Sequence, residues 1–393
     1  MTRSRIAVLI LVAAALGYQP DVVLAQTAAS ASAKDRVGEQ NPTPPAFRAG
    51  VILVPVDVRV VDAGGTSVTN LTAANFTIIE NDVRHQIAHF STLSYLAGAP
   101  PAPTPRTFFF VLGRGRLNET TKALDALIEF VRSRLLPTDR VGVMAYLHLV
   151  ELTTDHTGVV RLLERYRAQH DGIEDRLTRD GQRGPGAPSW ALGPDTQLAI
   201  DALFDASGLP PVQPVTAGAG GREIAVHDGP SLIRSLEYLG QIEGEKQLVL
   251  LIDHGFPNAA WYASGAAAAR VSVSMIQTRG NRAVWIPGGK FVGSLDPAPS
   301  PGAVLSAESA KTLAEHTGGQ LFSSWNATIA FDQLARAASF QYLLGFYPIK
   351  PPADGEYREL RVTVNRRGLT LLYRHSYEAR PRGAGTSVDS RLR

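Results

Sequence analysis

Histidine and carboxylate side chains are the first groups in this sequence whose types and spacing could carry chemistry. His254 directly follows Asp253, and His85 and His89 lie four positions apart. A histidine beside a carboxylate can act as a general base, and two histidines can hold a zinc ion. No nucleophile accompanies the first pair, however, and no third ligand accompanies the second. The sequence therefore predicts no catalytic residues and no enzymatic activity.

Motifs for nucleophilic catalysis and nucleotide binding are missing from the sequence. It contains no Gly-x-Ser-x-Gly elbow, no His-Glu-x-x-His pair and no P-loop. Cysteine does not occur, which excludes disulfides, thiolate nucleophiles and cysteine-based metal sites. The formal net charge is +3 and the basic residues are dispersed, so we expect no nucleic-acid partner.

Alternating strands and helices in the middle of the chain would position any site. Residues 107–112 and 248–252 are bare apolar runs, typical of strands buried on both faces. Other predicted elements are strands over 141–150, 283–286 and 321–323, helices over 124–135, 158–167, 196–206, 230–242, 263–278 and 307–316, and a mobile insertion over 173–188. This alternation predicts an α/β fold with a mostly parallel sheet flanked by helices. Ligands bind such sheets at the carboxyl ends of strands, so the loops after Leu112 and Ile252 and the region near Thr196 are candidate sites.

The segments on both sides of this middle region have sequence patterns typical of β-strands. Val54, Val56, Val58 and Val60 alternate with other residues, which is the period of a half-buried strand. Further strands are predicted over 76–80, 84–90, 341–347, 360–364 and 369–373. Since too few strands lie at either end for an independent sheet pair, we expect one discontinuous antiparallel β-sandwich with the α/β part inserted into it.

The first residues have the pattern of a secretory signal. Arg3 and Arg5 precede the apolar run 6–16, and small residues end at Ala25, so we expect cleavage there and no remaining transmembrane segment. The exported protein would be periplasmic or extracellular. The expected organisation is a signal peptide over 1–25, a flexible linker over 26–49, sandwich segments over 50–98 and 340–378, the α/β domain over 105–338, and a disordered tail over 379–393.

Four separate stretches carry a family resemblance. They are Val58–Asp62 with Leu71–Asn81, Pro137–Val143, Leu313–Gly319 and Tyr342–Phe346. In this order they resemble the von Willebrand factor type A fold, more narrowly a group of related proteins of the acidobacterial type. The resemblance runs from about Val51 to Tyr377. It implies a Rossmann-like sheet flanked by helices and a role in binding other proteins.

The best-known function that the resemblance implies is adhesion through a bound divalent cation. That site has an Asp-x-Ser-x-Ser loop after the first strand, a threonine from a second loop and an aspartate after the fourth strand. Thr196 matches the threonine and Asp253 the second aspartate, but Gly113, Gly115 and Leu117 occupy the three loop positions. Because a hard cation requires several oxygen ligands, we expect a degenerate site with no metal and no cofactor.

Substitute ligands leave an alternative open. Asn118, Glu119 or Asp195 could join Thr196 and Asp253 around Mg²⁺ or Ca²⁺. The chain would then be a cation-dependent adhesion module.

Two arginines offer a different chemistry in the loop after the first sheet strand. Arg114 and Arg116 flank a position that the motif gives to an oxygen ligand, and either guanidinium could pair bidentately with a partner carboxylate. The alternative is that both are solvated loop arginines. We therefore expect an exported binding or scaffold protein whose partner is another protein, contacted through an acidic residue. The candidate binding residues are Arg114, Arg116, Asn118, Thr196 and Asp253. A structural subunit of an envelope assembly is the further alternative.

Overall fold

The computed structural model describes residues 53–96, 98–100, 102–113, 121–181, 193–209, 229–252, 259–277, 283–286, 290–294, 301–323, 326–349 and 356–379. The chain divides into two compact units, residues 1–49 and 50–393, and every described residue belongs to the second. The predicted signal peptide and linker lie outside the described residues. None of the described helices is long and apolar enough to cross a membrane.

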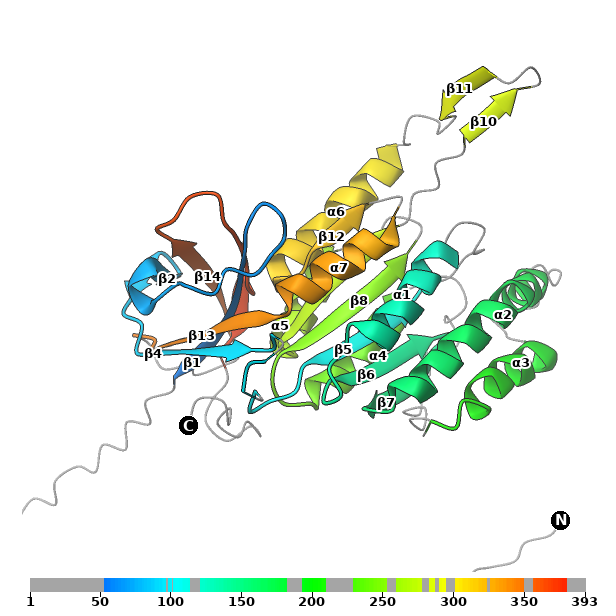
Figure 1. Ribbon diagram of the computed structural model, residues 1–393, viewed down its shortest axis with the longest axis horizontal. Helices are drawn as coiled ribbons and strands as arrows, with labels where there is room; N and C mark the ends of the chain where they lie inside the picture. Colours follow the sequence, from blue (N-terminus) through cyan, green and yellow to red (C-terminus); the bar gives the residue numbers. More distant parts are fainter. Residues whose placement is uncertain are drawn as a thin grey trace, which may run out of the picture. The chain divides into compact units, whose positions relative to one another are not determined.

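A six-stranded sheet lies at the centre of the α/β part, with the order β12-β9-β8-β5-β6-β7 (Figure 1). Its strands are β5 (Thr107–Leu112), β6 (Arg140–Ala145), β7 (His148–Thr153), β8 (Lys246–Ile252), β9 (Val271–Gln277) and β12 (Leu321–Ser323). Neighbouring strands are parallel except β6 and β7, which form an antiparallel hairpin. The mostly parallel sheet confirms the α/β fold predicted from the sequence.

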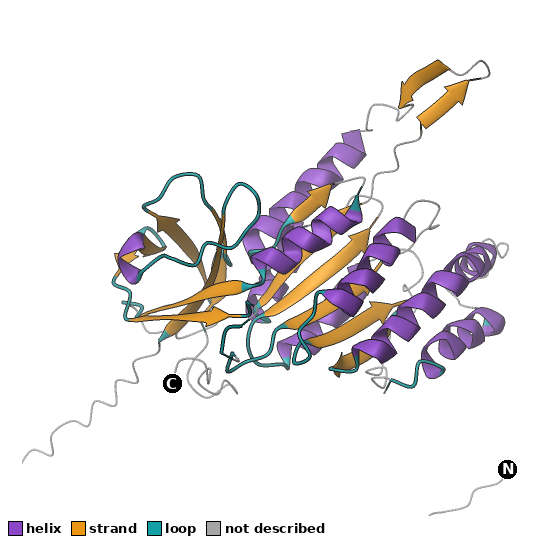
Figure 2. Cartoon of the chain, viewed as in Figure 1, coloured by secondary structure: helices purple, strands orange, loops and turns teal. Residues whose placement is uncertain are grey.

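Helices cover both faces of this sheet (Figure 2). One face packs against α1 (Thr121–Ser133), α2 (His156–Gly181), α3 (Pro194–Asp205) and α7 (Ala327–Ala337). The other packs against α4 (Gly229–Gly240), α5 (Ala259–Ala268) and α6 (Pro301–Thr317). Phe108 and Phe110 of β5 enter the first core and Phe109 the second, so every side chain of this strand is buried.

Two four-stranded antiparallel sheets, ordered β15-β1-β13-β4 and β16-β14-β2-β3, form the predicted sandwich. The first half of the chain supplies β1 (Val54–Val61), a 3-10 turn (Ala73–Asn75), β2 (Phe76–Glu80), β3 (Val83–His85) and β4 (His89–Ser94); the end supplies β13 (Phe340–Phe346), β14 (Tyr357–Val364), β15 (Thr370–Leu372) and β16 (Ser376–Glu378). Side chains of both sheets share one buried core that includes Ile78, Tyr342 and Val362. A separate two-stranded ribbon pairs β10 (Ala283–Ile286) with β11 (Lys290–Ser294).

Several element predictions were wrong. The strand predicted over 141–150 is the β6–β7 hairpin, turning at Tyr146 and Leu147. The helix predicted over 263–278 ends at Ala268, and the rest is strand β9, buried on both faces. The predicted mobile insertion over 173–188 begins inside α2, which continues to Gly181, while residues 182–188 lie outside the described part of the chain.

The strand predicted over 84–90 is also two elements. His85 in β3 pairs with Ile78 of one sheet, and His89 in β4 pairs with Gly345 of the other. The two histidines therefore belong to different sheets and do not form a pair on one face. His85 is buried, and its Nε2 lies 3.1 Å from Glu80 Oε2 within the sandwich.

Arg59 of β1 connects the sandwich to the α/β part through buried hydrogen bonds. Its Nη1 donates to Gln247 Oε1 of β8 at 2.7 Å. Its Nη2 donates to Ser272 Oγ of β9 at 3.0 Å and to the Gly318 carbonyl at 2.6 Å. Glu245 Oε1 lies 3.5 Å from the same nitrogen, and the Arg59 side chain is 4% exposed. The guanidinium thus contacts three segments of the α/β part at once.

Asp57 and Glu245, the two carboxylates at this junction, each accept hydrogen bonds at both oxygens. Arg270 donates to Asp57 Oδ2 at 2.7 Å, and Gln341 donates to Asp57 Oδ1 at 2.7 Å. Gln341 also donates to Glu245 Oε2 at 2.6 Å, while Ser272 Oγ donates to Oε1 at 2.9 Å. Such saturation is what buried charges require to be stable.

Gly318 and Gly319 allow the turn after α6 to approach two backbones. Gly318 has φ +77°, and a Cβ there would lie 2.7 Å from the carbonyl carbon of Tyr373 in the sandwich. A Cβ on Gly319 would lie 2.0 Å from the Val273 carbonyl oxygen of β9. Because both obstacles are backbone atoms, neither position accepts a side chain without displacing an element.

Replacing Gly319 with alanine should therefore be strongly destabilising. We expect Gly319→Ala to lower the free energy of unfolding by about 3 kcal/mol or more, because overpacking here moves backbone rather than a rotamer. Gly172→Ala is the matched control, since a Cβ in that turn of α2 meets nothing within 4 Å. It should stabilise the protein by up to about 1 kcal/mol. Urea unfolding measures both, and equal midpoints for the two variants would contradict the packing argument.

Candidate functional site

The sheet changes winding direction between β5 and β8. From β5 the chain proceeds to β6 and β7 on one side, whereas from β8 it proceeds to β9 and β12 on the other. The carboxyl ends of the two strands are held together, since Gly113 N donates to the Leu251 carbonyl at 2.8 Å. Open parallel sheets bind ligands in the crevice outside such a switch point. This edge is therefore the candidate site.

Four predicted site residues follow these strand ends outside the described residues. Arg114, Arg116 and Asn118 come after β5 in the sequence, and Asp253 comes directly after β8. Their predicted binding roles stay predictions. The described part of the edge consists of Gly113, Ile252 and the side chains that pack beneath them.

A buried cluster of tyrosine and histidine lies beside Gly113. The Tyr166 hydroxyl of α2 donates to the Gly113 carbonyl at 3.4 Å. Its ring centroid lies 4.8 Å from that of His170, one turn further along the helix. His170 Nδ1 shares a hydrogen bond with the Tyr146 hydroxyl of the β6–β7 turn, and the His170 side chain is fully buried. Because His170 is shielded from solvent, we infer that the cluster serves to hold the carboxyl end of β5 in place.

The β6–β7 turn in this cluster has an unusual backbone. Tyr146 and Leu147 have φ values of 48° and 63°, so a two-residue hairpin turn is built without glycine or asparagine. Each such residue costs about 1 to 2 kcal/mol, and strain of this kind concentrates at functional sites. His148 Nδ1 lies 3.2 Å from the Tyr146 carbonyl, and its Nε2 lies 2.9 Å from Asp201 Oδ1 of α3.

The sequence interpretation missed this cluster although a signal was present. Tyr166 and His170 are four positions apart, which places them on one helix face. Ending the predicted helix at Arg167 separated the two residues. The positive φ values of Tyr146 and Leu147 had no sequence signal, because neither residue type favours that conformation.

Thr196 and Asp195 lie at the start of α3. The Thr196 hydroxyl donates to Asp180 Oδ2 at 2.6 Å, and Gly193 N donates to the same oxygen at 2.8 Å. Arg176 Nη1 donates to the Asp195 carbonyl at 3.1 Å. Thr196 is 2% exposed and Asp180 is 7% exposed. The Thr196 hydroxyl thus links the start of α3 to the end of α2.

The length of α2 separates these residues from the strand ends. Tyr166 contacts Gly113, whereas Asp180 holds Thr196, and the two lie in one 26-residue helix. Tyr166 and Asp180 are nearly four turns apart, roughly 20 Å along the helix axis at 1.5 Å per residue. Thr196 and its sequence neighbour Asp195 thus lie well away from Gly113.

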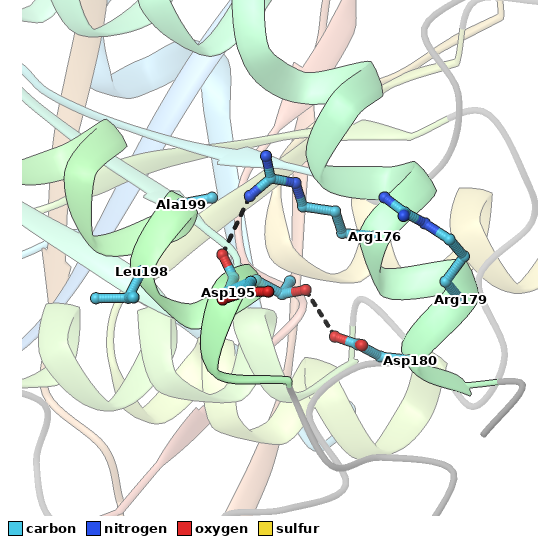
Figure 3. A pocket seen from close by; sticks show the side chains of 7 residues that line it. Arg176, Arg179, Asp180, Asp195, Leu198 and Ala199 are labelled. Atoms are coloured by element: carbon cyan, nitrogen blue, oxygen red, sulfur yellow. Dashed lines mark hydrogen bonds between the residues drawn. The ribbon is translucent and has the colours of Figure 1, made fainter.

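A surface pocket of about 680 Å³ lies between α2 and α3. In Figure 3, Arg176 and Arg179 extend from α2, while Asp195, Leu198 and Ala199 come from α3. Leu198 is 66% exposed, and both arginines are exposed. The pocket thus has two arginine side chains on one side and the apolar Leu198 and Ala199 on the other. Throughout the described ranges, no group of three or more histidine or acidic side chains could hold a metal ion.

Comparisons with known proteins give only distant similarities. A scan against protein-family models finds no match, and a search of curated proteins finds none either. Two solved structures are similar: an aerotolerance-related membrane protein from Bacteroides fragilis NCTC 9343, and BatB from Bacteroides thetaiotaomicron. Each is 13% identical with a TM-score of 0.32, over 60% of this chain and 98% or 97% of its own. At that TM-score the likeness carries no argument about function.

Removing the Asp180 carboxylate should loosen α3. We expect Asp180→Ala to lower the free energy of unfolding by about 1 to 3 kcal/mol, because the buried Thr196 hydroxyl and Gly193 N–H lose their acceptor. Amide hydrogen exchange in the first turn of α3 should accelerate as well. Asp205→Ala at the exposed end of α3 is the control and should change neither quantity appreciably. Unchanged exchange in Asp180→Ala would contradict the anchoring role.

Proposed function

We propose that the α/β part is a von Willebrand factor A-like module that binds another protein at the carboxyl edge of β5 and β8. The observation that carries this proposal is the strand order, with its switch point between these two strands and its antiparallel edge strand β7. The four sequence stretches that resemble the family support the same interpretation. The strained β6–β7 turn beside Gly113 favours a functional role for this edge.

Binding rather than catalysis is the proposed role of this edge. Among the described residues, the histidine in the cluster beside Gly113 is His170, which is fully buried and bonded to Tyr146. A general base must reach a substrate proton within hydrogen-bond distance, and a shielded imidazole does not. The sequence adds no nucleophile motif near either strand end.

A cation is not required in the proposed interaction. Gly113 stands where the family motif begins with aspartate, and Arg114 and Arg116 follow it. The Thr196 hydroxyl is directed to Asp180, roughly 20 Å along α2 from the Tyr166 contact with the edge. We propose that the two arginines bind a carboxylate of the partner instead, because a guanidinium offers paired donors to one carboxylate. Coordination of Mg²⁺ or Ca²⁺ by Asp253, Thr196 and Asp195 is the alternative.

The proposed location is outside the cytoplasm, periplasmic or extracellular. The first 25 residues have the charged, apolar and small-residue order of a signal peptide. A scaffold in the envelope is a second candidate role, for which the sandwich offers a surface. Val83, Tyr347 and Ile349 are 44%, 50% and 73% exposed, and His85 of β3 contacts the Tyr347 carbonyl. Exposed apolar side chains of this kind are suited to protein contacts.

Site-specific photo-crosslinking tests the protein-binding role. A benzophenone side chain at position 117, next to Arg116 in the sequence, should give a discrete adduct with one protein when the full chain is expressed in its native host. The same group at Arg132, on the outer surface of α1, is the control and should give none. The double variant Arg114→Ala, Arg116→Ala should weaken the adduct by about tenfold, since it loses charge-assisted hydrogen bonds. Equal adducts from positions 117 and 132, or none from position 117, would refute the proposed surface.

Calorimetric titration with Mg²⁺, Mn²⁺ and Ca²⁺ tests the cation separately. We expect no saturable heat and no change in melting temperature on addition of chelator, because few oxygen ligands remain. Saturable binding that Asp253→Ala abolishes would replace the arginine mechanism with cation-dependent adhesion.

A further inference from the structure

A cavity lies at the junction of the sandwich and the α/β part, at the amino-terminal edge of the central sheet. Its volume is about 150 Å³, and Thr107, Arg140 and Gln247 line it near the beginnings of β5, β6 and β8. This edge is opposite to the carboxyl ends of the strands, so the cavity is separate from the proposed protein-binding surface. Ligand pockets form preferentially at such domain junctions.

Three arginines and two glutamates line this cavity. Arg59 and Arg140 each have a buried Nε with no hydrogen-bond partner among the described residues. Arg59 is 3% exposed, and its terminal nitrogens are occupied by the junction. A buried donor without an acceptor costs free energy, and two beside one cavity call for an acceptor that the chain does not supply.

Arg106 and Glu245, which also line the cavity, are already engaged. Arg106 Nε donates to Asp139 Oδ1 at 3.0 Å, and a second bond joins Nη2 to Oδ2. The Arg106 guanidinium also lies 5.3 Å from the ring centroids of Tyr95 and Phe108. The Glu245 oxygens accept hydrogen bonds from neighbouring side chains. The unsatisfied donors are therefore cationic, and their complement is an anion.

The cavity continues into a larger apolar groove. A groove of about 560 Å³ shares Tyr95, Thr104, Pro105 and Arg140 with it. Leu96, Pro100, Leu136 and Pro137 are among the residues that line the groove. Arg140 therefore lies where a small polar cavity meets an apolar groove. This arrangement is typical of pockets for organic ligands with one charged group.

We propose that the junction binds a small organic carboxylate, with its head in the arginine-lined cavity and its apolar body in the groove. Arg140 holds the carboxylate, and the buried Nε of Arg59 lies at the same cavity. The ligand spans Tyr95, in the connection from β4 to β5, and the start of β6, so its binding favours the docked arrangement of the sandwich and the α/β part.

Calorimetric titration of the full chain with octanoate tests this assignment. Octanoate should bind saturably at a single site. Octanamide, which has the same shape without the charge, and inorganic phosphate, which has the charge without the apolar body, should each bind about tenfold more weakly or worse. Absence of saturable octanoate binding, or equal binding of octanoate and either probe, would overturn the proposal.

Variants and chemical protection locate the site. Arg140→Gln should weaken octanoate binding by about tenfold, whereas Arg134→Gln, an exposed arginine that pairs with Asp332, should leave it unchanged. In the unmodified chain, octanoate should also protect Arg140 from phenylglyoxal, measured by peptide mass spectrometry, so the test does not depend on a variant folding. Equal loss in both variants, or no protection, would contradict the site. The Arg114→Ala, Arg116→Ala protein should bind octanoate normally, which separates this site from the carboxyl edge.

Discussion

The buried guanidinium of Arg59 is the contact on which the arrangement of the sandwich and the α/β part depends. Burial lowers the pKa of this group from its ordinary value, and the nearby Glu245 and Asp57 carboxylates oppose that shift. A charge withdrawn from water costs free energy, which hydrogen-bond acceptors at its terminal nitrogens offset. Gln247, Ser272 and the Gly318 carbonyl supply acceptors from β8, β9 and the turn after α6. One cation thereby fixes three segments, and the glycine turn brings the third within reach.

Much of the fold follows from local patterns in the sequence. The bare apolar runs predict β5 and β8 because a strand buried on two faces accepts few polar residues. The alternating valines predict strand β1, but the prediction that it is half-buried was wrong, because Asp57 and Arg59 on its other face are buried against the α/β part. The predictions of individual elements failed where two elements join without a glycine, proline or asparagine between them. The chain passes from α5 into β9 through Arg270, at φ 52°, and from β6 into β7 through Tyr146 and Leu147. Tertiary packing stabilises these turns, so composition alone does not mark them.

The candidate site was predictable in its location and less so in its members. Strand order makes the carboxyl ends of β5 and β8 the candidate site, as the alternation of strands and helices predicts. Thr196 was assigned to that edge from its position in sequence, but the length of α2 sets its distance from Gly113. Buried side-chain pairs such as Tyr146 and His170 depend on contacts between remote segments. No local pattern encodes them.

The α/β part begins and ends on adjacent strands. Ser94 at the end of β4 pairs with Phe340 at the start of β13, and Tyr95 N donates to the Ser339 carbonyl at 2.8 Å. The whole insertion is thus a loop whose ends are already closed by a β ladder, and its length adds little to the entropy of closure. Evolution can therefore lengthen, shorten or exchange the inserted module while the sandwich keeps its register, as long as the two entry points stay a strand spacing apart.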